Sequence, residues 1–207
     1  MNVYLVRHGE SEGNLKNLHQ SPEMLLTEEG KRQVIILSKR LKNIPINIIY
    51  SSPFARARQT AEIISGELKL PIEYWESLKE RKRPSEIFGL KTNDPRAVRI
   101  NTLISTNWPK GGWKYSDDET FEELKGRAEE VLEHLLKKHK KQNILCVSHG
   151  TIMRMIASVA IFGKDLAPDL FWKFNKHTSS GNTGITHLEY LKGGLWKLVS
   201  WNDTAHL

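Results

Sequence analysis

The stretch that decides the fold runs from Val3 to Asn14 and reads VYLVRHGESEGN. Its first four residues are aliphatic or aromatic, which is the pattern of a short strand buried on both faces. The run stops at Arg7-His8-Gly9, so a cation and an imidazole follow the strand directly. Because ligand crevices in α/β sheets lie at the carboxyl ends of strands, Arg7 and His8 are candidate site residues. Gly9 permits a sharp turn without a side chain beside the imidazole.

A second apolar run ends in the same way. Residues 144–148 read ILCVS, which is typical of a buried strand, and His149-Gly150 precedes a helix expected from about Thr151 to Phe162. A single histidine after a strand is more often structural than catalytic. Two strand-ending His-Gly pairs in one small α/β chain favour a functional role for His8 and His149 together.

Strands and helices alternate along the chain, which predicts an α/β fold, a three-layer α/β/α sandwich around a mostly parallel central sheet. Capping patterns predict helices after Thr27, after Ser52-Pro53 and after Thr120. Glu123 completes a capping box with Thr120. Two strands joined at Lys192-Gly193-Gly194 predict a hairpin that gives the sheet an antiparallel edge.

The composition fits a single domain over residues 1–207. Hydrophobic residues make up 39% and charged residues 27% of the chain, as in soluble globular proteins. No apolar run approaches the ~18 residues of a membrane helix, and the strand pattern that begins at Val3 leaves no room for a signal peptide. Cys146 is the only cysteine and lies in an apolar run, so we expect a buried, inert thiol and a reducing, cytoplasmic location.

Residues from about 81 to 116 interrupt the regular pattern and are expected to form an inserted lid segment. They mix turn residues with basic ones, and a short helix would fit after Asp94-Pro95. A connection this long inside a compact domain is usually a lid or a binding loop. Eight basic and two acidic side chains lie between Arg81 and Lys114, against a net charge of +7 for the whole chain. This concentration of charge favours an anionic ligand.

Arg56 and Arg58 lie in the opening turn of the helix that follows Ser52-Pro53. Two cations near a helix N-terminus oppose the helix dipole. A bound anion at that helix end would remove the conflict, whereas a solvated surface pair is the simpler explanation.

With Glu10, Ser11 and Asn14 included, the opening stretch closely resembles the signature of the histidine phosphatase superfamily, whose best-known branch is the cofactor-dependent phosphoglycerate mutases. The strings SSPFARARQTA at 51–61, VSHG at 147–150 and NTGIT at 182–186 also resemble motifs of that family. The similarity covers most of the chain and is thinnest between residues 84 and 115. It implies a phosphoglycerate mutase-like fold and a metal-independent phosphomonoester hydrolase that acts on a small anionic phosphorylated metabolite.

The resemblance also implies a role for each candidate residue. His8 would attack phosphorus in line and form a phosphohistidine, while Arg7 and Arg56 hold the non-bridging oxygens. Arg56 matches the family's phosphate-binding arginine, and Arg58 is then expected to be a surface residue. Glu80 stands where the family places its proton donor. The remaining expectations are His149 as a further donor in the site, Glu86 as the alternative acid, Asn14, Ser11 and Gly150 as substrate contacts, and the lid residues Arg81 and Arg83 as binders of a second anionic group.

Three other functions stay open. A phosphoglycerate mutase-type enzyme would return the phosphoryl group to its substrate, although the sequence around Glu80 departs from the mutase pattern. A metal hydrolase could use His8, Glu10 and His149, but no recognisable metal motif supports them. A non-catalytic binder of phosphate or nucleic acid would fit the positive charge, although the intact set of His8, Arg56 and His149 and the lack of a nucleic-acid module argue against it.

The expected partner is therefore a small-molecule phosphorylated substrate. No metal or cofactor is expected, and neither nucleic acid nor a membrane is an expected partner. We expect a monomer or a homodimer. In the acid-phosphatase branch of the family an Asp follows the second histidine, and Gly150 at that position argues against that branch.

Overall fold

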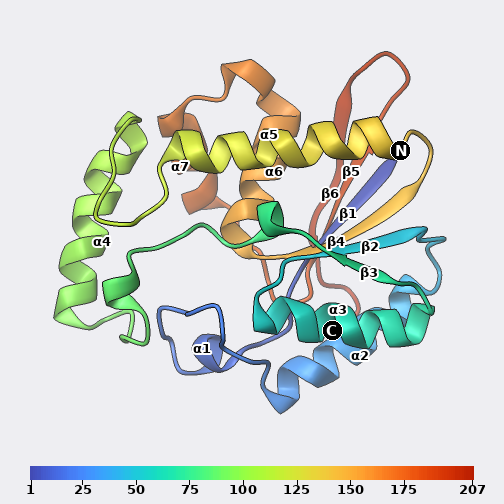
Figure 1. The fold of residues 1–207 in the computed structure, drawn as a ribbon, viewed down its shortest axis with the longest axis horizontal. Helices are drawn as coiled ribbons and strands as arrows, with labels where there is room; N and C mark the ends of the chain where they lie inside the picture. The colour runs from blue at the N-terminus through green and yellow to red at the C-terminus, as the bar shows by residue number, and fades with distance from the viewer.

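The computed structural model describes residues 1–207, and its centre is one six-stranded sheet in the order β3-β2-β4-β1-β5-β6 (Figure 1). Four strands are parallel to one another, and β5 and β6 add an antiparallel edge. The predicted sheet is therefore confirmed. The strands are β1 (Asn2–Arg7), β2 (Ile48–Ser51), β3 (Ile72–Tyr74), β4 (Asn143–Ser148), β5 (Ile185–Tyr190) and β6 (Trp196–Asp203).

Helices cover both faces of the sheet, which confirms the three-layer sandwich. Figure 1 shows α2 and α3 on one side and α5 and α6 on the other. The larger apolar cluster, of 26 buried residues against 13, lies on the α5–α6 side. The helices are α1 (Glu12–Leu15), α2 (Glu28–Leu41), α3 (Ala55–Leu68), α4 (Pro95–Asn107), α5 (Phe121–Lys138), α6 (Gly150–Phe162) and α7 (Pro168–His177), with single 3₁₀ turns η1 (Glu76–Leu78), η2 (Ser85–Ile87), η3 (Trp108–Lys110) and η4 (Gly163–Asp165).

The neighbouring strands β1 and β4 bring the two strand-ending histidines together. Arg7 and Ser148 are partners in the parallel register of these strands. The next residues along each strand, His8 and His149, therefore leave the sheet side by side at its carboxyl edge. This edge is where ligands bind in α/β sheets.

Two of the three predicted helix caps are present. Thr27 caps α2, and Thr120 forms the predicted capping box at the start of α5. The prediction for Ser52 was wrong, because α3 has Phe54 at its N-cap and no side-chain cap there. The Ser52 hydroxyl instead lies 2.8 Å from Nε2 of His149. Ser52 therefore belongs to the surroundings of that histidine rather than to a helix end.

Residues 81–116 contain more regular structure than the sequence predicts. Asp94 caps α4, which runs for 13 residues with Pro95 in its first turn. Ile100 and Ile104 of α4 are buried in the larger core together with Trp108. Figure 1 shows α4 at one end of the sandwich, beyond the start of α5. The segment therefore forms a packed wall at that end of the molecule.

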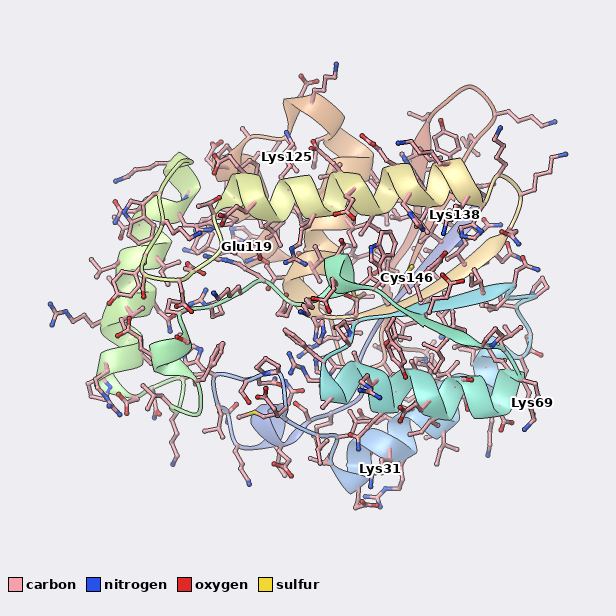
Figure 2. The ribbon with its side chains drawn as sticks, viewed as in Figure 1. Lys31, Lys69, Glu119, Lys125, Lys138 and Cys146 are labelled. Carbon is pink, nitrogen blue, oxygen red and sulfur yellow. The ribbon has the colours of Figure 1, made fainter.

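Figure 2 labels Cys146 within the sheet and several lysine side chains on the outer helices. Cys146 lies inside the sheet, where burial raises the pKa of its thiol to about 12. An enclosed neutral thiol is not a nucleophile, which agrees with the sequence prediction. Lys31 and Lys69 point outward from the α2–α3 layer. None of the helices combines the length and the apolar character that crossing a membrane would require.

Candidate active site

The orientation of the His8 ring is fixed by two hydrogen bonds. Nδ1 donates to the carbonyl oxygen of Gly9 at 2.7 Å, and Nε2 accepts from Nε of Arg56 at 3.2 Å. The proton is therefore on Nδ1, and the lone pair is on Nε2. Burial, followed by the charges of Arg56 and Arg7, holds the pKa of His8 well below its ordinary value. The result is a neutral imidazole whose Nε2 lone pair lies beside two guanidinium groups.

His149 is fully buried next to His8. The two ring centroids are 5.1 Å apart, and Phe54 packs on His149 at 5.3 Å. Nε2 of His149 is hydrogen-bonded to Ser52, while Nδ1 has no partner. Burial first, and Arg56 second, lower the pKa of His149 well below its ordinary value. His149 is thus a second neutral imidazole, enclosed behind the first.

Arg7 and Arg56 supply the positive charge at this edge of the sheet. Arg56 projects from the first turn of α3 and is only 2% exposed. Its Nη1 donates to the carbonyl oxygen of Ser21 at 2.9 Å. Burial is the main reason that the pKa of Arg56 falls to about 10, which still leaves it charged at neutral pH. Arg7 donates to the carbonyl oxygen of Ser180, and its buried Nε has no partner.

Glu80 faces the same space from the opposite side. Its carboxylate accepts hydrogen bonds at 3.1 Å from the backbone N–H groups of Thr151 and Ile152, in the first turn of α6. The N–H of Arg81 adds a third, at 2.8 Å. A helix N-terminus is a favourable place for a carboxylate. Glu86, the alternative acid, is exposed and does not line the cavity described below.

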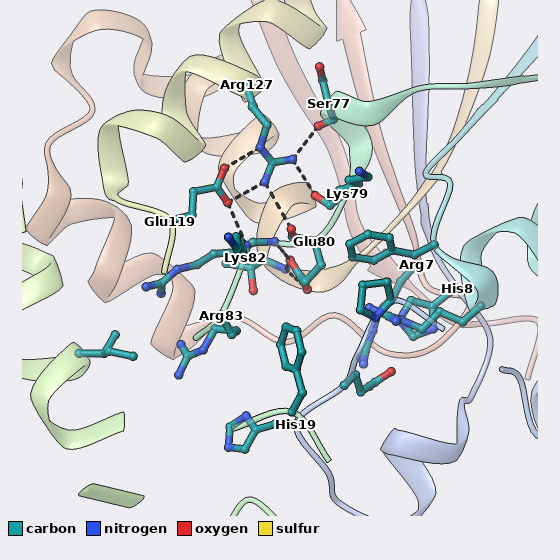
Figure 3. Close-up of a pocket in the computed structure, with 18 of the residues that line it drawn as sticks. Arg7, His8, His19, Ser77, Lys79, Glu80, Lys82, Arg83, Glu119 and Arg127 are labelled. Atoms are coloured by element: carbon teal, nitrogen blue, oxygen red, sulfur yellow. Dashed lines mark hydrogen bonds and ion pairs between the residues drawn. The ribbon is translucent and has the colours of Figure 1, made fainter. Parts of the chain in front are cut away.

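Arg127 on α5 holds the backbone that carries Glu80. Its guanidinium donates to the carbonyl oxygens of Ser77, Lys79 and Glu80 at 3.0, 2.8 and 3.4 Å. It also forms a two-pronged ion pair with Glu119, at 2.6 and 2.8 Å. Figure 3 shows this clamp above Glu80, on the side away from His8. Arg127 lies in the helix that was predicted after Thr120, but its role could not be predicted, because nothing in the local sequence reveals these contacts.

A cavity of about 880 Å³ opens in front of these groups. Arg7, His8, Arg56 and Glu80 line one part of it. His149 is not among the residues that line it. The rest of its wall includes Leu18, His19, Arg81, Lys82, Arg83, Phe88, Asn101, Ile104, Arg127 and Trp172.

Asn14 and Ser11, which were expected to contact substrate, support the loop behind His8. The Asn14 amide oxygen accepts from N and Oγ of Ser11 at 3.2 and 2.9 Å, which closes a capping box at α1. Asn182 donates both to this oxygen and to the carbonyl oxygen of His8, at 3.2 and 2.9 Å. Neither Asn14 nor Ser11 lines the cavity. Both residues are well placed to hold the His8 main chain in position.

Gly150 opens α6 between three charged side chains of the site. A Cβ atom added there would come within 3.3 Å of Nη1 of Arg154, which is a tight contact, and would make ordinary contacts with the Glu80 carboxylate at 3.9 Å and with Arg7 at 4.0 Å. A side chain at this position would therefore displace the end of Arg154.

The two lid arginines differ in what they contact. Arg81 is buried in an ion pair with Asp118 at 2.7 Å, and its guanidinium lies 4.2 Å from the ring of Trp108. Arg83 has no ion pair and donates to the side-chain oxygen of Asn101. Arg58 is an exposed surface residue, as expected, 3.9 Å from Glu62.

Comparison with known proteins agrees with this geometry. The family model of the histidine phosphatase superfamily (branch 1) matches residues 3–204. The chain is 29% identical to an uncharacterized phosphatase, PhoE, of Bacillus subtilis, over 99% of this chain and 96% of that one. It is 28% identical to a metal-independent phosphoserine phosphatase of Arabidopsis thaliana, over 99% and 82% of the two chains.

Solved structures agree with the sequence relatives. A phosphoserine phosphatase mutant from Entamoeba histolytica, solved in complex with phosphoserine, has a TM-score of 0.82 and 27% identity and covers 100% of this chain and 98% of its own. The expected resemblance and enzyme class are thereby confirmed: the chain belongs to the histidine phosphatase superfamily, branch 1, and is a phosphatase.

Proposed function

We propose that this phosphatase hydrolyses monoesters of small phosphorylated metabolites with His8 as the nucleophile and Glu80 as the acid. The observation that carries the proposal is the state of His8, whose basic Nε2 faces Arg56 while Nδ1–H is held by the Gly9 carbonyl. An imidazole held in this tautomer can attack without first losing a proton.

The first step transfers the phosphoryl group to the protein. Nε2 of His8 forms a bond to phosphorus as the bond between phosphorus and the leaving oxygen breaks. Arg7 and Arg56 neutralise the charge on the non-bridging oxygens, which is the main requirement of phosphoryl transfer. Glu80 gives its proton to the leaving oxygen.

The second step releases inorganic phosphate. Glu80, now a carboxylate, takes a proton from a water molecule whose oxygen attacks phosphorus in line with His8. The bond between phosphorus and Nε2 breaks, and the neutral imidazole is restored. In this scheme Asn14, Ser11 and His149 position the nucleophile, and residues 81–116 form a lid-like wall within a single domain.

The relatives narrow the expected substrates. The similarity to phosphoserine phosphatases supports small monoesters that carry a carboxylate, with phosphoserine as the first compound to test. A mutase would instead return the phosphoryl group to a second hydroxyl of its substrate. The identity of the product therefore distinguishes the two reactions.

The test is an assay of phosphate release by the purified chain after exhaustive treatment with EDTA. The substrates are phosphoserine, a panel of sugar and acid phosphates, and 4-nitrophenyl phosphate as a generic control. We expect release of inorganic phosphate without added metal, because arginines and imidazoles supply the charge stabilisation. Loss of activity on chelation with recovery on adding Mg²⁺ or Zn²⁺, or an isomerised product without free phosphate, would contradict the proposal.

A further inference from the structure

The cavity extends well beyond the groups that handle one phosphoryl group. Its volume of about 880 Å³ lies near the upper end of the ~300–1,000 Å³ typical of pockets that enclose drug-sized ligands. Leu18, Phe88, Ile104 and Trp172 add apolar surface to its wall. A three-carbon phosphoester would leave much of this space unfilled.

Arg83 is the unpaired cation in the part of the cavity away from His8. Most other cations in the wall have a carboxylate partner, since Arg81 pairs with Asp118, Lys82 with Asp117, Arg127 with Glu119 and Lys79 with Glu76. The exceptions are Arg7 and Arg56, which belong to the His8 end, and Arg83. In Figure 3, Arg83 and His8 lie on opposite sides of the cavity. No carboxylate forms an ion pair with Arg83, although the more distant Asp118 and Glu80 partly offset the effect of burial, which lowers its pKa.

Arg83 is also held in place by a directed chain of hydrogen bonds. Its Nη2 donates to Oδ1 of Asn101, and Nδ2 of Asn101 lies 3.2 Å from Nε2 of His19. Burial first, and the charge of Arg83 second, lower the pKa of His19 from its ordinary value. A neutral His19 can accept the amide proton of Asn101. The amide then presents its oxygen to Arg83.

The surrounding backbone makes this arrangement rigid. The N–H of His19 donates to the carbonyl oxygen of Leu90 at 2.9 Å, and the N–H of Gly89 donates back to His19 at 2.8 Å. Asn101 and Ile104 lie three residues apart on one face of α4, so both reach the cavity from the same helix. Arg83 is therefore a preorganised guanidinium with free donors, which suits recognition of a carboxylate or a phosphate.

We propose that Arg83, Asn101 and His19 form a second oxyanion subsite, and that the substrate is two-ended. One end is the phosphomonoester at His8, and the other is a carboxylate or a second phosphate at Arg83. A spacer of more than three carbons joins them across the apolar part of the cavity. This inference rests on the proposed phosphomonoester site at His8 and adds the class of substrate which that site takes.

The test measures binding of phosphonates, which the enzyme cannot hydrolyse. Alkylphosphonates, ω-phosphonocarboxylates and α,ω-bisphosphonates of matched chain length are titrated calorimetrically at about 0.15 M salt, where charge steering is largely screened. We expect the terminal anion to tighten binding roughly tenfold to a hundredfold at a best length above three carbons, as for a charge-assisted hydrogen-bonded pair. The carboxylate and bisphosphonate series show which second anion is preferred.

Three variants locate the effect. The preference is the ratio of the affinities for phosphonates with and without the terminal anion. In Arg83→Gln this ratio should fall to near one. Asn101→Asp keeps Arg83 but gives it a carboxylate partner, so the preference should also be lost. Arg96→Gln is the matched control, because Arg96 lies on α4 like Asn101 but pairs with Asp94 and has a side chain that is 72% exposed. It should keep the wild-type preference, and thermal melting confirms that each variant is folded.

The outcomes separate the two proposals. A wild-type protein without any preference for the terminal anion overturns the subsite. So does a preference that survives in both Arg83→Gln and Asn101→Asp, in which case Arg83 only anchors α4. Failure of the proposed function would appear elsewhere, as absence of phosphate release from every phosphomonoester, including 4-nitrophenyl phosphate, while the phosphonates still bind.

Discussion

At the scale of single residues, the chemistry depends on which groups of the site carry a proton. His8 is neutral and its tautomer is fixed, so Nε2 is ready to attack. Four carboxylates line the cavity. Glu76 and Glu119 are held in ion pairs and Glu130 accepts a hydrogen bond from Ser77, whereas Glu80 has no cation partner and is held at the start of α6 by backbone N–H groups. A leaving alkoxide needs a proton, and a neutral imidazole that has become phosphorylated cannot supply it. In the proposed mechanism Glu80 therefore carries the acid role.

Replacement of Glu80 by Gln should affect substrates according to their leaving group. General acid catalysis contributes about 10²- to 10⁴-fold when the leaving oxygen is strongly basic, and much less when it is already a weak base. In Glu80→Gln, kcat/KM should fall by that amount for alkyl phosphates and far less for 4-nitrophenyl phosphate. Steady-state assays on both substrate classes measure this. Equal losses, or the selective loss in Glu86→Gln instead, would move the proton donor away from Glu80.

At the scale of secondary-structure elements, the site depends on α5 as much as on the strand ends. Arg127 ties the carbonyl groups of Ser77, Lys79 and Glu80 to Glu119. The backbone of Lys82 joins the same network, because its N–H donates to the Glu119 carboxylate at 3.1 Å. One guanidinium on α5 thus holds the backbone of Glu80, the proposed proton donor.

Arg127→Lys should impair catalysis in the same pattern as Glu80→Gln. A lysine cannot bridge three carbonyl groups and a carboxylate at once, so Glu80 would move, and a displacement of about 1 Å can cost roughly 10²-fold in rate. The loss should again be larger for alkyl phosphates, and Glu80→Gln should add little in the Arg127→Lys background. Lys137→Gln, an exposed change on the same helix, is the control. Fully additive effects of the two substitutions would show that Arg127 does not act through Glu80.

The same network marks the limit of prediction from sequence. Arg7, His8, Arg56 and His149 could be singled out because each follows or opens an element whose pattern is local. The wall formed by α4 was expected as a lid segment with a short helix after Asp94-Pro95. That helix is present, but turn residues and basic side chains hide its length and the buried spacing of Ile100 and Ile104. Arg83 contacts Asn101, 18 positions away, and Arg127 contacts the carbonyl group of Ser77, 50 positions away. Only the packing of α4 and α5 brings these residues together.

At the scale of the whole molecule, burial of the neutral histidines couples stability to pH. The pKa values of His8 and His149 are lowered in the folded state, while the unfolded chain retains values near 6.5. At pH values above 6.5 neither state binds the protons. As the pH falls below 6.5 the unfolded state binds them first, so the free energy of unfolding decreases toward the lower folded-state pKa values.

The wild-type protein should therefore lose stability between about pH 7 and pH 5. Each buried histidine contributes at most ~1.4 kcal/mol per pH unit to the slope. In His149→Gln that contribution disappears, so its unfolding free energy should depend less steeply on pH, whatever its absolute value. Urea denaturation at several pH values measures both slopes. An identical slope in the variant would contradict a neutral, buried His149.

The central claim is that the phosphoryl group passes through His8, and the most direct measurement is trapping of that intermediate. The Glu80→Gln variant with a radiolabelled aryl phosphate suits it, because the first step then needs little acid while the second lacks its base. Base quenching should recover up to one labelled phosphate per chain, as an acid-labile, base-stable phosphoramidate that peptide mapping places on His8. The double variant His8→Ala/Glu80→Gln should carry none. Label on another residue, or an undiminished adduct in the double variant, would contradict the account.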